Sequence, residues 1–381
     1  MKMDRLSLAA FAAVVACFAG CKPDDGLGDL AEGRAAYEAR DLRKAEKCLE
    51  ASYAASATNA DTLVYLARVK LDLGQLSEAR KYVGKAAELA GADIDVRLLS
   101  AQIAWHVKDY AAASAAFAAI AKDEKLGAEL RAEGWTGVGI VEMTCNNRDL
   151  ARIALLRAIR LDRRNAAAWY HLGLLYRDSF GYSWAALEQF NIYVRLDGEA
   201  SPRVQKVQRA FIPELKESIA RSATDIPGAH RRDSAASAAA ITKAEEAWKK
   251  GNFKTARLQY QEAVKADALS YPAALGLAKA WLKTDATRNG QVKALDCYRQ
   301  ACVLRPGAIS TYLTTGDLCA RLGQNAQAVE IYSRAVAADP ASFAALDGLI
   351  RSLRRTGTKE KAKIAQAYQL YRDSLTPPKK K

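Results

Sequence analysis

Residues that commonly carry catalytic chemistry are few in this sequence, and they are not grouped. The 381 residues include only three histidines, and no two stand four apart, as a pair of metal ligands on one helix would. The seven cysteines include no Cys-x-x-Cys pair, so neither a zinc site nor a redox pair is indicated. Sustained alternation of β-branched and polar residues is also missing, which argues against strands. The sequence predicts an all-α protein without a catalytic site, metal or cofactor.

The glycines do not indicate an enzyme either. Gly134, Gly137 and Gly139 are spaced somewhat like those of a phosphate-binding loop, but no strand precedes them. We interpret them as sites of close helix packing. An enzyme would need its chemistry within residues 198–232, whose only histidine is His230 and which contain no cysteine. A small-molecule substrate is therefore not expected.

The first twenty residues have the pattern of an export signal. Lys2 and Arg5 precede residues 6–19, an apolar and small-residue run shorter than the roughly 20 residues of a membrane-spanning helix. The run ends in Phe18-Ala19-Gly20-Cys21, which resembles the lipobox of bacterial lipoproteins, although Phe18 replaces the usual leucine. The resemblance implies that Cys21 receives a diacylglycerol and becomes the new N-terminus. We predict a lipoprotein signal peptide over 1–20 and a tether over 21–26.

Two alternatives to lipid attachment at Cys21 stay open. Cys17 also follows small and apolar residues, and a plain secretory signal could be cut near Ala19. Lys22 stands where an aspartate would, by the same resemblance, signal retention in the inner membrane. The predicted location is the bacterial cell envelope, with the lipid in the outer membrane and the protein facing the periplasm.

Five cysteines remain after the signal and the lipid site, an odd number that cannot all pair within the chain. We expect them to be small buried hydrophobic residues; they are Cys48, Cys145, Cys297, Cys302 and Cys319.

The net charge of +14 is unevenly distributed. Residues 351–381 contain ten Lys or Arg and only two Asp or Glu. Lys379, Lys380 and Lys381 end a tail, 376–381, which we interpret as solubilising; contact with an anionic surface is the alternative. Nucleic acid is not an expected partner of an exported protein whose positive charge is this local.

One small-residue position recurs along the chain with a nearly constant period. Successive separations are 34, 34, 38, 35, 70, 38, 34 and 34 residues, and the alanines concerned are Ala45, Ala79, Ala113, Ala151, Ala186, Ala256, Ala294, Ala328 and Ala362. Such a period indicates stacked supersecondary units. The fullest unit adds Trp169, Leu172, Gly173, Tyr176 and Phe190 at helical spacings.

This period and these residues resemble the tetratricopeptide repeat (TPR) family over about residues 27 to 375. The resemblance implies a right-handed superhelical solenoid of helix-turn-helix repeats, about nine units long. Left-handed glycine caps are expected at the ends of the first helices, at Gly74, Gly251, Gly323 and Gly357.

The repeat pattern fails once, between Ala186 and Ala256. Ser201-Pro202 predicts a helix start, and one long helix bent at Pro213 can follow. We therefore predict an N-terminal array over 27–222, a linker over 223–232 and a C-terminal array over 233–375. The alternative is one continuous superhelix with a degenerate unit at the junction.

The resemblance also implies that the concave face, lined mainly by first helices, holds a peptide or a helix of a partner protein. Trp105 and Trp248 could equally pack between helices, and the Lys and Asn clamp by which some TPR domains hold a terminal carboxylate is absent. The candidate groove residues are Arg68, Asp72, Trp105, His106, Tyr170, Leu174, Arg177, Asp178, Glu245, Trp248, Lys249, Arg351, Arg354 and Arg355.

These observations favour a non-catalytic scaffold or adaptor that is held in the envelope by its lipid and binds proteins, in secretion, pilus or cell-wall assembly. The alternative is a structural lipoprotein that links the outer membrane to the cell wall.

Overall fold

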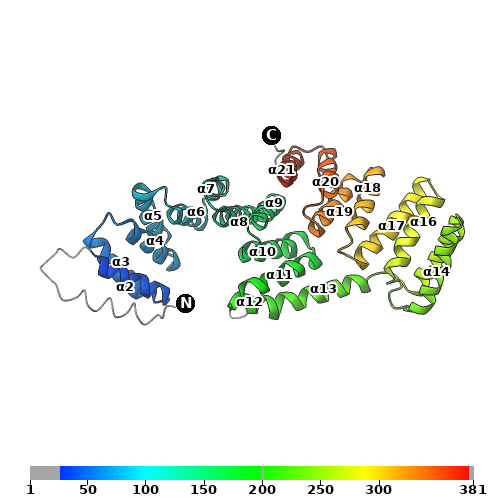
Figure 1. Cartoon of the computed structure of the whole chain (residues 1–381), viewed down its shortest axis with the longest axis horizontal. Coiled ribbons are helices and arrows are strands. Elements are labelled where there is room, and N and C mark those ends of the chain that lie inside the picture. The colour runs from blue at the N-terminus through cyan, green and yellow to red at the C-terminus, as the bar shows by residue number, and fades with distance from the viewer. Residues whose placement is uncertain (1–25, 199–200, 377–381) are drawn as a thin grey trace, which may run out of the picture. The chain divides into compact units, whose positions relative to one another are not determined.

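The computed structural model describes residues 26–198 and 201–376, and within these ranges the regular structure is helical (Figure 1). A single isolated backbone bridge joins Arg232 and Asp267. The predicted all-α fold of repeated helix pairs is confirmed. The described residues divide into two compact units, one ending at Ile120 and the other beginning at Ala121.

The first unit is a row of helices in which each pair follows the predicted period. Lys70 is almost fully buried, and its Nζ lies 2.7, 2.9 and 2.8 Å from carboxylate oxygens of Glu46, Glu50 and Glu78. Burial alone would lower the pKa of Lys70, but the three glutamates hold it above its usual value. This one ammonium group joins three consecutive helices. The helices of the unit are α2 (Leu27–Glu38), α3 (Leu42–Ala55), α4 (Ala60–Asp72), α5 (Leu76–Ala90), α6 (Ile94–His106) and α7 (Tyr110–Lys122), the last of which crosses the boundary.

The first half of the second unit contains two repeats and then a long helical run. Its elements are α8 (Ala128–Thr144), α9 (Arg148–Leu161), α10 (Ala166–Leu174), the π-helical turn η2 (Leu175–Phe180), α11 (Ser183–Asp197), α12 (Pro202–Lys206), the π-helical turn η3 (Val207–Phe211) and α13 (Ile212–Thr224). As predicted, the run starts after Ser201 with Pro202 in its first turn. The π-helical turn precedes Pro213, which has no N–H to donate to the preceding turn. A single helical run thus occupies the stretch where a helix pair was missing.

The second half of this unit consists of four helix pairs. They are α14 (Ser234–Lys249) with α15 (Phe253–Ala266), α16 (Tyr271–Thr284) with α17 (Arg288–Leu304), α18 (Ile309–Arg321) with α19 (Asn325–Ala338), and α20 (Phe343–Arg355) with α21 (Lys359–Leu375).

The two halves of the second unit pack against one another, largely through second helices of their pairs. Helix α9 contacts α21 and helix α13 contacts α17. Between them, Trp184 of α11 stacks on Tyr312 of α18 with ring centroids 6.5 Å apart. The compact units therefore differ from the two predicted arrays: residues 121–222 belong with 233–375. Residues near 225–233 do leave the helix between α13 and α14, where the linker was predicted.

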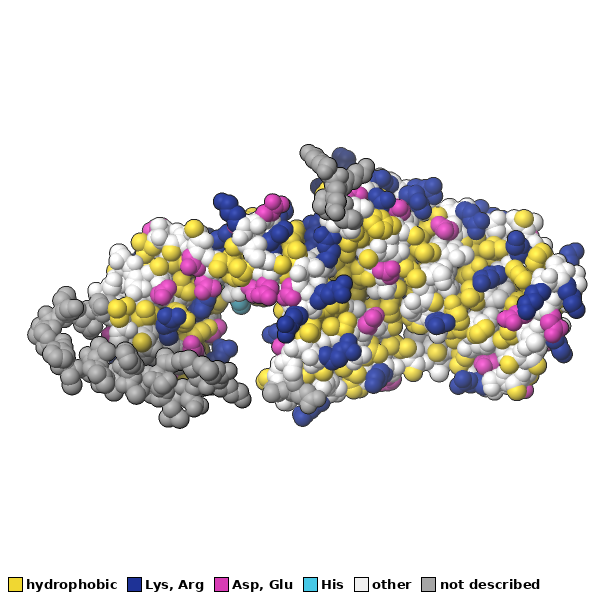
Figure 2. Space-filling view, in the orientation of Figure 1, with side chains coloured by type: hydrophobic (Ala, Val, Ile, Leu, Met, Phe, Trp, Pro, Cys, Tyr) yellow, Lys and Arg dark blue, Asp and Glu magenta, His cyan; other side chains and the backbone are white. Residues whose placement is uncertain are grey.

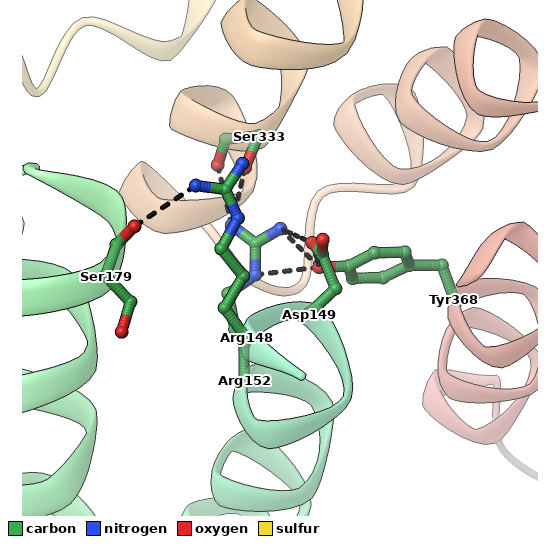
Figure 3. Close-up of polar contacts among 6 residues, drawn as sticks. All are labelled: Arg148, Asp149, Arg152, Ser179, Ser333 and Tyr368. Carbon is green, nitrogen blue, oxygen red and sulfur yellow. Dashed lines mark hydrogen bonds and ion pairs between the residues drawn. The ribbon is translucent and has the colours of Figure 1, made fainter. Parts of the chain in front are cut away.

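A buried polar cluster joins α9 to α19 and α21 (Figure 3). Arg152 is fully buried. Its Nε donates to the Tyr368 hydroxyl at 2.8 Å, and its Nη1 donates to the Ser333 carbonyl at 3.1 Å and hydroxyl at 2.9 Å. Asp149 lies 3.1 Å from Nη2 and accepts a hydrogen bond of 2.7 Å from Tyr368. The guanidinium also lies 4.5 Å from the ring centroid of Phe180.

Burial lowers the pKa of Arg152, but Tyr368 and Asp149 more than offset this, so its pKa lies above the usual value and the group is a permanent cation. A buried charge is tolerated only when it is paired and hydrogen-bonded. The cluster meets that requirement with groups from three helices.

The recurring alanines mark the closest approaches of the helices. Eight of the nine, from Ala45 to Ala328, are fully buried. The ninth assignment was wrong: Ala362 is exposed, and the buried alanine of α21 is Ala365, about one turn later. The buried face of α21 includes Tyr368, which packs on α9, and this contact sets the rotation of the helix.

Helix ends follow the predicted capping chemistry. Gly74, Gly251, Gly323 and Gly357 have φ of 75, 77, 80 and 78°, the left-handed region that glycine adopts without steric cost. At the matching turns of other pairs the structure has Arg40, Lys108 and Asn146 at φ of 62, 65 and 59°. These three residues adopt a conformation that strains a side-chain-bearing residue.

Candidate protein-binding groove

The first helices of the last four pairs form a continuous row. Helix α14 contacts α16, and α18 contacts α20. Helices α16 and α18 are joined by a 2.9 Å hydrogen bond between the hydroxyls of Tyr271 and Thr311. The row is hollowed at two places, which have volumes of about 260 and 620 Å³. We call this row of helices with its two hollows the α14–α20 groove.

Tyrosine rings seated on glycines form the floor of this groove. A Cβ atom added to Gly276 would lie 2.2 Å from the Tyr260 ring, and one added to Gly348 would lie 2.2 Å from the Tyr332 ring. No other residue fits at these two positions without displacing a tyrosine. Burial and the hydrogen bond that its hydroxyl donates to Asp317 raise the pKa of Tyr332, so this phenol stays neutral.

The rim of the groove is charged and predominantly positive. Its charged side chains are all exposed, and among the described residues none of them forms a salt bridge; they are Glu245, Lys249 and Lys279 in the smaller hollow and Asp317, Arg321, Arg351 and Arg355 in the larger. Five cations thus stand against two anions. In Figure 2, Lys and Arg side chains are numerous near both the α14 and the α20–α21 ends of this unit.

Five of the fourteen residues suggested by the sequence lie in or beside this groove. Glu245, Trp248 and Lys249 line the smaller hollow, and Arg351 and Arg355 line the larger. Trp248 is half-buried and packs edge-on against Phe253, with ring centroids 4.9 Å apart, so it also belongs to the helix packing. Arg354 is exposed on the same helix but does not line the groove.

Sequence reasoning missed Lys279, Asp317 and Arg321, although the repeat period could have identified them. Lys279 follows Glu245 by 34 residues, Asp317 follows Lys279 by 38, and Arg351 follows Asp317 by 34. These are the steps of the alanine series, so one slot of each first helix points to the groove. Arg321 and Arg355 are likewise 34 residues apart.

Two of the candidates in the first unit, Arg68 and Asp72, already form polar contacts within the protein. Arg68 lies 3.6 Å from Asp95. Asp72 accepts hydrogen bonds from the Tyr37 hydroxyl at 3.0 Å and from Arg40 at 3.2 Å.

Trp105 and His106 lie together at the end of α6. Their rings meet edge-on at 4.7 Å, with the indole half-buried and the imidazole exposed. These residues stay groove predictions for the first unit.

Two of the four candidates of α10 and η2, Tyr170 and Arg177, pack against the helical run 202–224. Tyr170 contacts Tyr193 with ring centroids 5.1 Å apart, and Arg203 lies over its ring at 5.1 Å. Leu174 is partly buried in the main core. Arg177 pairs with Asp178 at 2.5 Å and lies 3.7 Å from the centroid of the Phe211 ring. This cover could not be predicted, because residues 198–232 lack the repeat pattern.

Other chemistry is sparse in the part of the chain that the structure describes. Residues 26–198 and 201–376 contain no His, Cys, Asp and Glu group suited to a metal ion, and none of their helices is long and apolar enough to cross a membrane. Burial, and secondarily Arg203, lower the pKa of His171 to about 4.

The five predicted cysteines are unpaired but not uniformly buried. Cys302 and Cys319 are buried as expected, Cys48 and Cys297 are half-buried, and Cys145 is exposed, against the prediction. Burial raises the pKa of Cys302 to about 11, so this thiol is not ionised at neutral pH.

Comparisons with known proteins agree with the repeat pattern. Models of the tetratricopeptide repeat match residues 36–103, 241–308 and 313–374, together more than half of the chain. No curated protein matches the sequence significantly.

Several solved structures are similar in fold at low sequence identity. MamA is 18% identical over 50% of this chain and 97% of its own, with a TM-score of 0.37. PilF of Pseudomonas aeruginosa is 15% identical over 52% of this chain and 91% of its own, with a TM-score of 0.41. The Cut9–Hcn1 structure is 14% identical over 99% of this chain and 84% of its own, with a TM-score of 0.35. With three matched ranges that fall on helix pairs, and with eight buried alanines at the expected steps, the chain belongs to the tetratricopeptide repeat family.

Proposed function

We propose that this protein is a non-catalytic scaffold that binds other proteins in its α14–α20 groove and is held in the bacterial envelope by a lipid on Cys21. The observation that carries the binding role is the charged rim of the groove, which is exposed and forms no salt bridge with any residue that the structure describes. In contrast, Arg68 and Asp72 of the first unit are already engaged. Exposed Arg side chains beside aromatic rings are typical anchors of protein interfaces.

The envelope location is supported by the sequence of residues 1–21, which lie outside the described residues. A lipid would keep the groove close to a membrane and raise its effective concentration for partners assembled there. Secretion, pilus and cell-wall assembly are the processes that such an anchored scaffold would serve. The basic tail 376–381 falls largely outside the described residues as well, and its contact with an anionic surface stays a prediction.

Site-specific photocrosslinking in cells tests the binding role. A photoreactive residue replaces Lys279 in the groove or, as a matched control, Lys265, an exposed lysine of the second helix α15 that does not line the groove. We expect a discrete protein adduct from position 279 and none from position 265. No protein adduct at 279, or the same adduct at both positions, would contradict the scaffold. An adduct with cell-wall material instead favours the structural lipoprotein that links the outer membrane to the wall.

Metabolic labelling with a palmitate analogue tests the lipid separately. Wild-type protein and Cys17→Ala should be labelled, and Cys21→Ala should not. If Cys21→Ala keeps its label and Cys17→Ala loses it, the lipid is on Cys17. If the wild-type protein carries no more label than a background strain, the anchor is refuted and the signal is a plain secretory one.

A further inference from the structure

We propose that the α14–α20 groove recognises an acidic, extended segment within a partner protein; this inference rests on the proposed scaffold function and names its ligand class. The rim presents Lys249, Lys279, Arg321, Arg351 and Arg355 against only Glu245 and Asp317. Complementary charge across an interface speeds association and selects the partner, and a segment rich in Asp and Glu is the complement of this rim.

The cations are distributed along the row of helices and not gathered at one point. Lys249 lies on α14, Lys279 on α16, Arg321 on α18, and Arg351 and Arg355 on α20. Packed helices are about 9 Å apart, so three steps along the row cover about 27 Å. An extended chain advances about 3.3 Å per residue, so about eight residues of a ligand would reach every cation. A segment of this length can be recognised within the partner's chain, without a free terminus of that chain.

The floor suits a polypeptide backbone. Because Gly276 and Gly348 have no Cβ, the rings of Tyr260 and Tyr332 can lie directly against these two positions of the first helices. These two tyrosines are only 7% and 2% exposed, so a ligand would mainly meet the charged rim; the Tyr332 hydroxyl is already engaged with Asp317. Short side chains of a segment can rest on such a floor while its carboxylates reach the rim.

The two rim carboxylates favour a peptide over a nucleic acid. Glu245 and Asp317 interrupt the series of cations. A phosphate backbone carries a negative charge at every residue and would be repelled at both positions. A peptide can instead place a backbone N–H or a lysine opposite each carboxylate.

The test measures binding of a defined probe to the mature, unlipidated protein by fluorescence anisotropy at low salt. The probe is a fluorescein-labelled peptide of about twelve residues that alternates Glu and Ser, with an amidated C-terminus. Its neutral control replaces every Glu by Gln. We expect the Glu peptide to bind at least about tenfold more tightly than the Gln peptide and to weaken as salt is raised.

Two arginines of α20 supply a matched pair of variants. Arg354 and Arg355 both lie in the last turn of α20 and are both exposed, so reversal of either charge perturbs the helix end similarly. Only Arg355 lines the groove. We expect Arg355→Glu to weaken the Glu peptide about fivefold or more and Arg354→Glu to weaken it less than about twofold.

Several results would overturn the ligand class. They are absence of measurable Glu-peptide binding, equal affinity for the Gln peptide, equal effects of Arg354→Glu and Arg355→Glu, or tighter binding of an oligothymidylate of similar length. If crosslinking from position 279 captures a protein whose bound segment is neutral, the scaffold stands and the acidic ligand is refuted.

Discussion

The buried contact between Arg152 and Tyr368 predicts how firmly α21 is held on α9. Tyr368→Phe removes one oxygen without opening a cavity, and it deletes the acceptor of the Nε hydrogen bond and the donor to Asp149. A buried donor left without a partner costs about 1–3 kcal/mol, more when it is charged. Arg152 keeps both bonds to Ser333, so we expect a loss of about 2 kcal/mol in the free energy of unfolding.

Tyr371→Phe is the matched control. Tyr371 is also buried on α21, three residues later, and its hydroxyl takes no part in the hydrogen bonds of Arg152, Asp149 and Ser333 described above. The same one-oxygen deletion should therefore change the unfolding free energy by less than about 0.5 kcal/mol. Arg152→Met removes the cation itself, leaves Asp149 without its ion partner, and should cost about 3–5 kcal/mol.

Urea unfolding measures the size of the stability loss, and hydrogen exchange shows which helices lose protection. In Tyr368→Phe the amides of α21 should exchange faster, while those of α14 and α15 should change little, because the lost bonds join α21 to α9. Equal stability of Tyr368→Phe and Tyr371→Phe would show that the polar cluster contributes nothing. A uniform rise in exchange over the whole unit would show that it does not act locally.

Three further predictions concern single positions. Lys108→Gly should stabilise the protein by about 0.5–1 kcal/mol, because Lys108 has φ of 65°, and Lys108→Ala should not; urea midpoints of the two variants decide this. Ala328→Glu places a carboxylate at a fully buried contact and should cost several kcal/mol, with exchange protection lost in α18–α20 but retained in α2–α5. His171 has a pKa of about 4 in the folded protein against 6.5 in the unfolded chain, so the free energy of unfolding should fall as the pH drops from 6.5 towards 4, where only the unfolded chain binds the proton. Urea titrations of His171→Gln should lack this pH-dependent loss.

Much of the repeat architecture could be predicted from the sequence because its determinants are local. A small residue at the close helix contact and a left-handed residue, often glycine, after the first helix are requirements that one helix pair imposes by itself, and both were met at Ala328 and Gly323. Part of the groove could be predicted for the same reason, because equivalent positions recur on successive first helices.

What could not be predicted depends on contacts between distant repeats. Nothing around Arg152 indicates a partner 216 residues away, and an arginine in a helical repeat is usually at the surface. With this contact formed, the buried alanine of α21 is Ala365 and not the predicted Ala362. The contact also joins residues 121–222 to the last four repeats. Likewise, Arg177 was expected to face open space, but the patternless run 202–224 supplied Phe211 to cover it.

The distance in sequence between Arg152 and Tyr368 also has a consequence for the order of assembly. In a simple solenoid each repeat needs only its neighbour, so folding can follow synthesis repeat by repeat. Here α9 leaves the ribosome 216 residues before the tyrosine that pairs with its arginine, which at about 5–20 residues per second is roughly 10–40 s. Throughout that interval the guanidinium lacks Ser333 and Tyr368, and of the partners described above only Asp149 of its own helix is present. Until Tyr368 is synthesised, the charge of Arg152 would help to keep the first half of the second unit soluble.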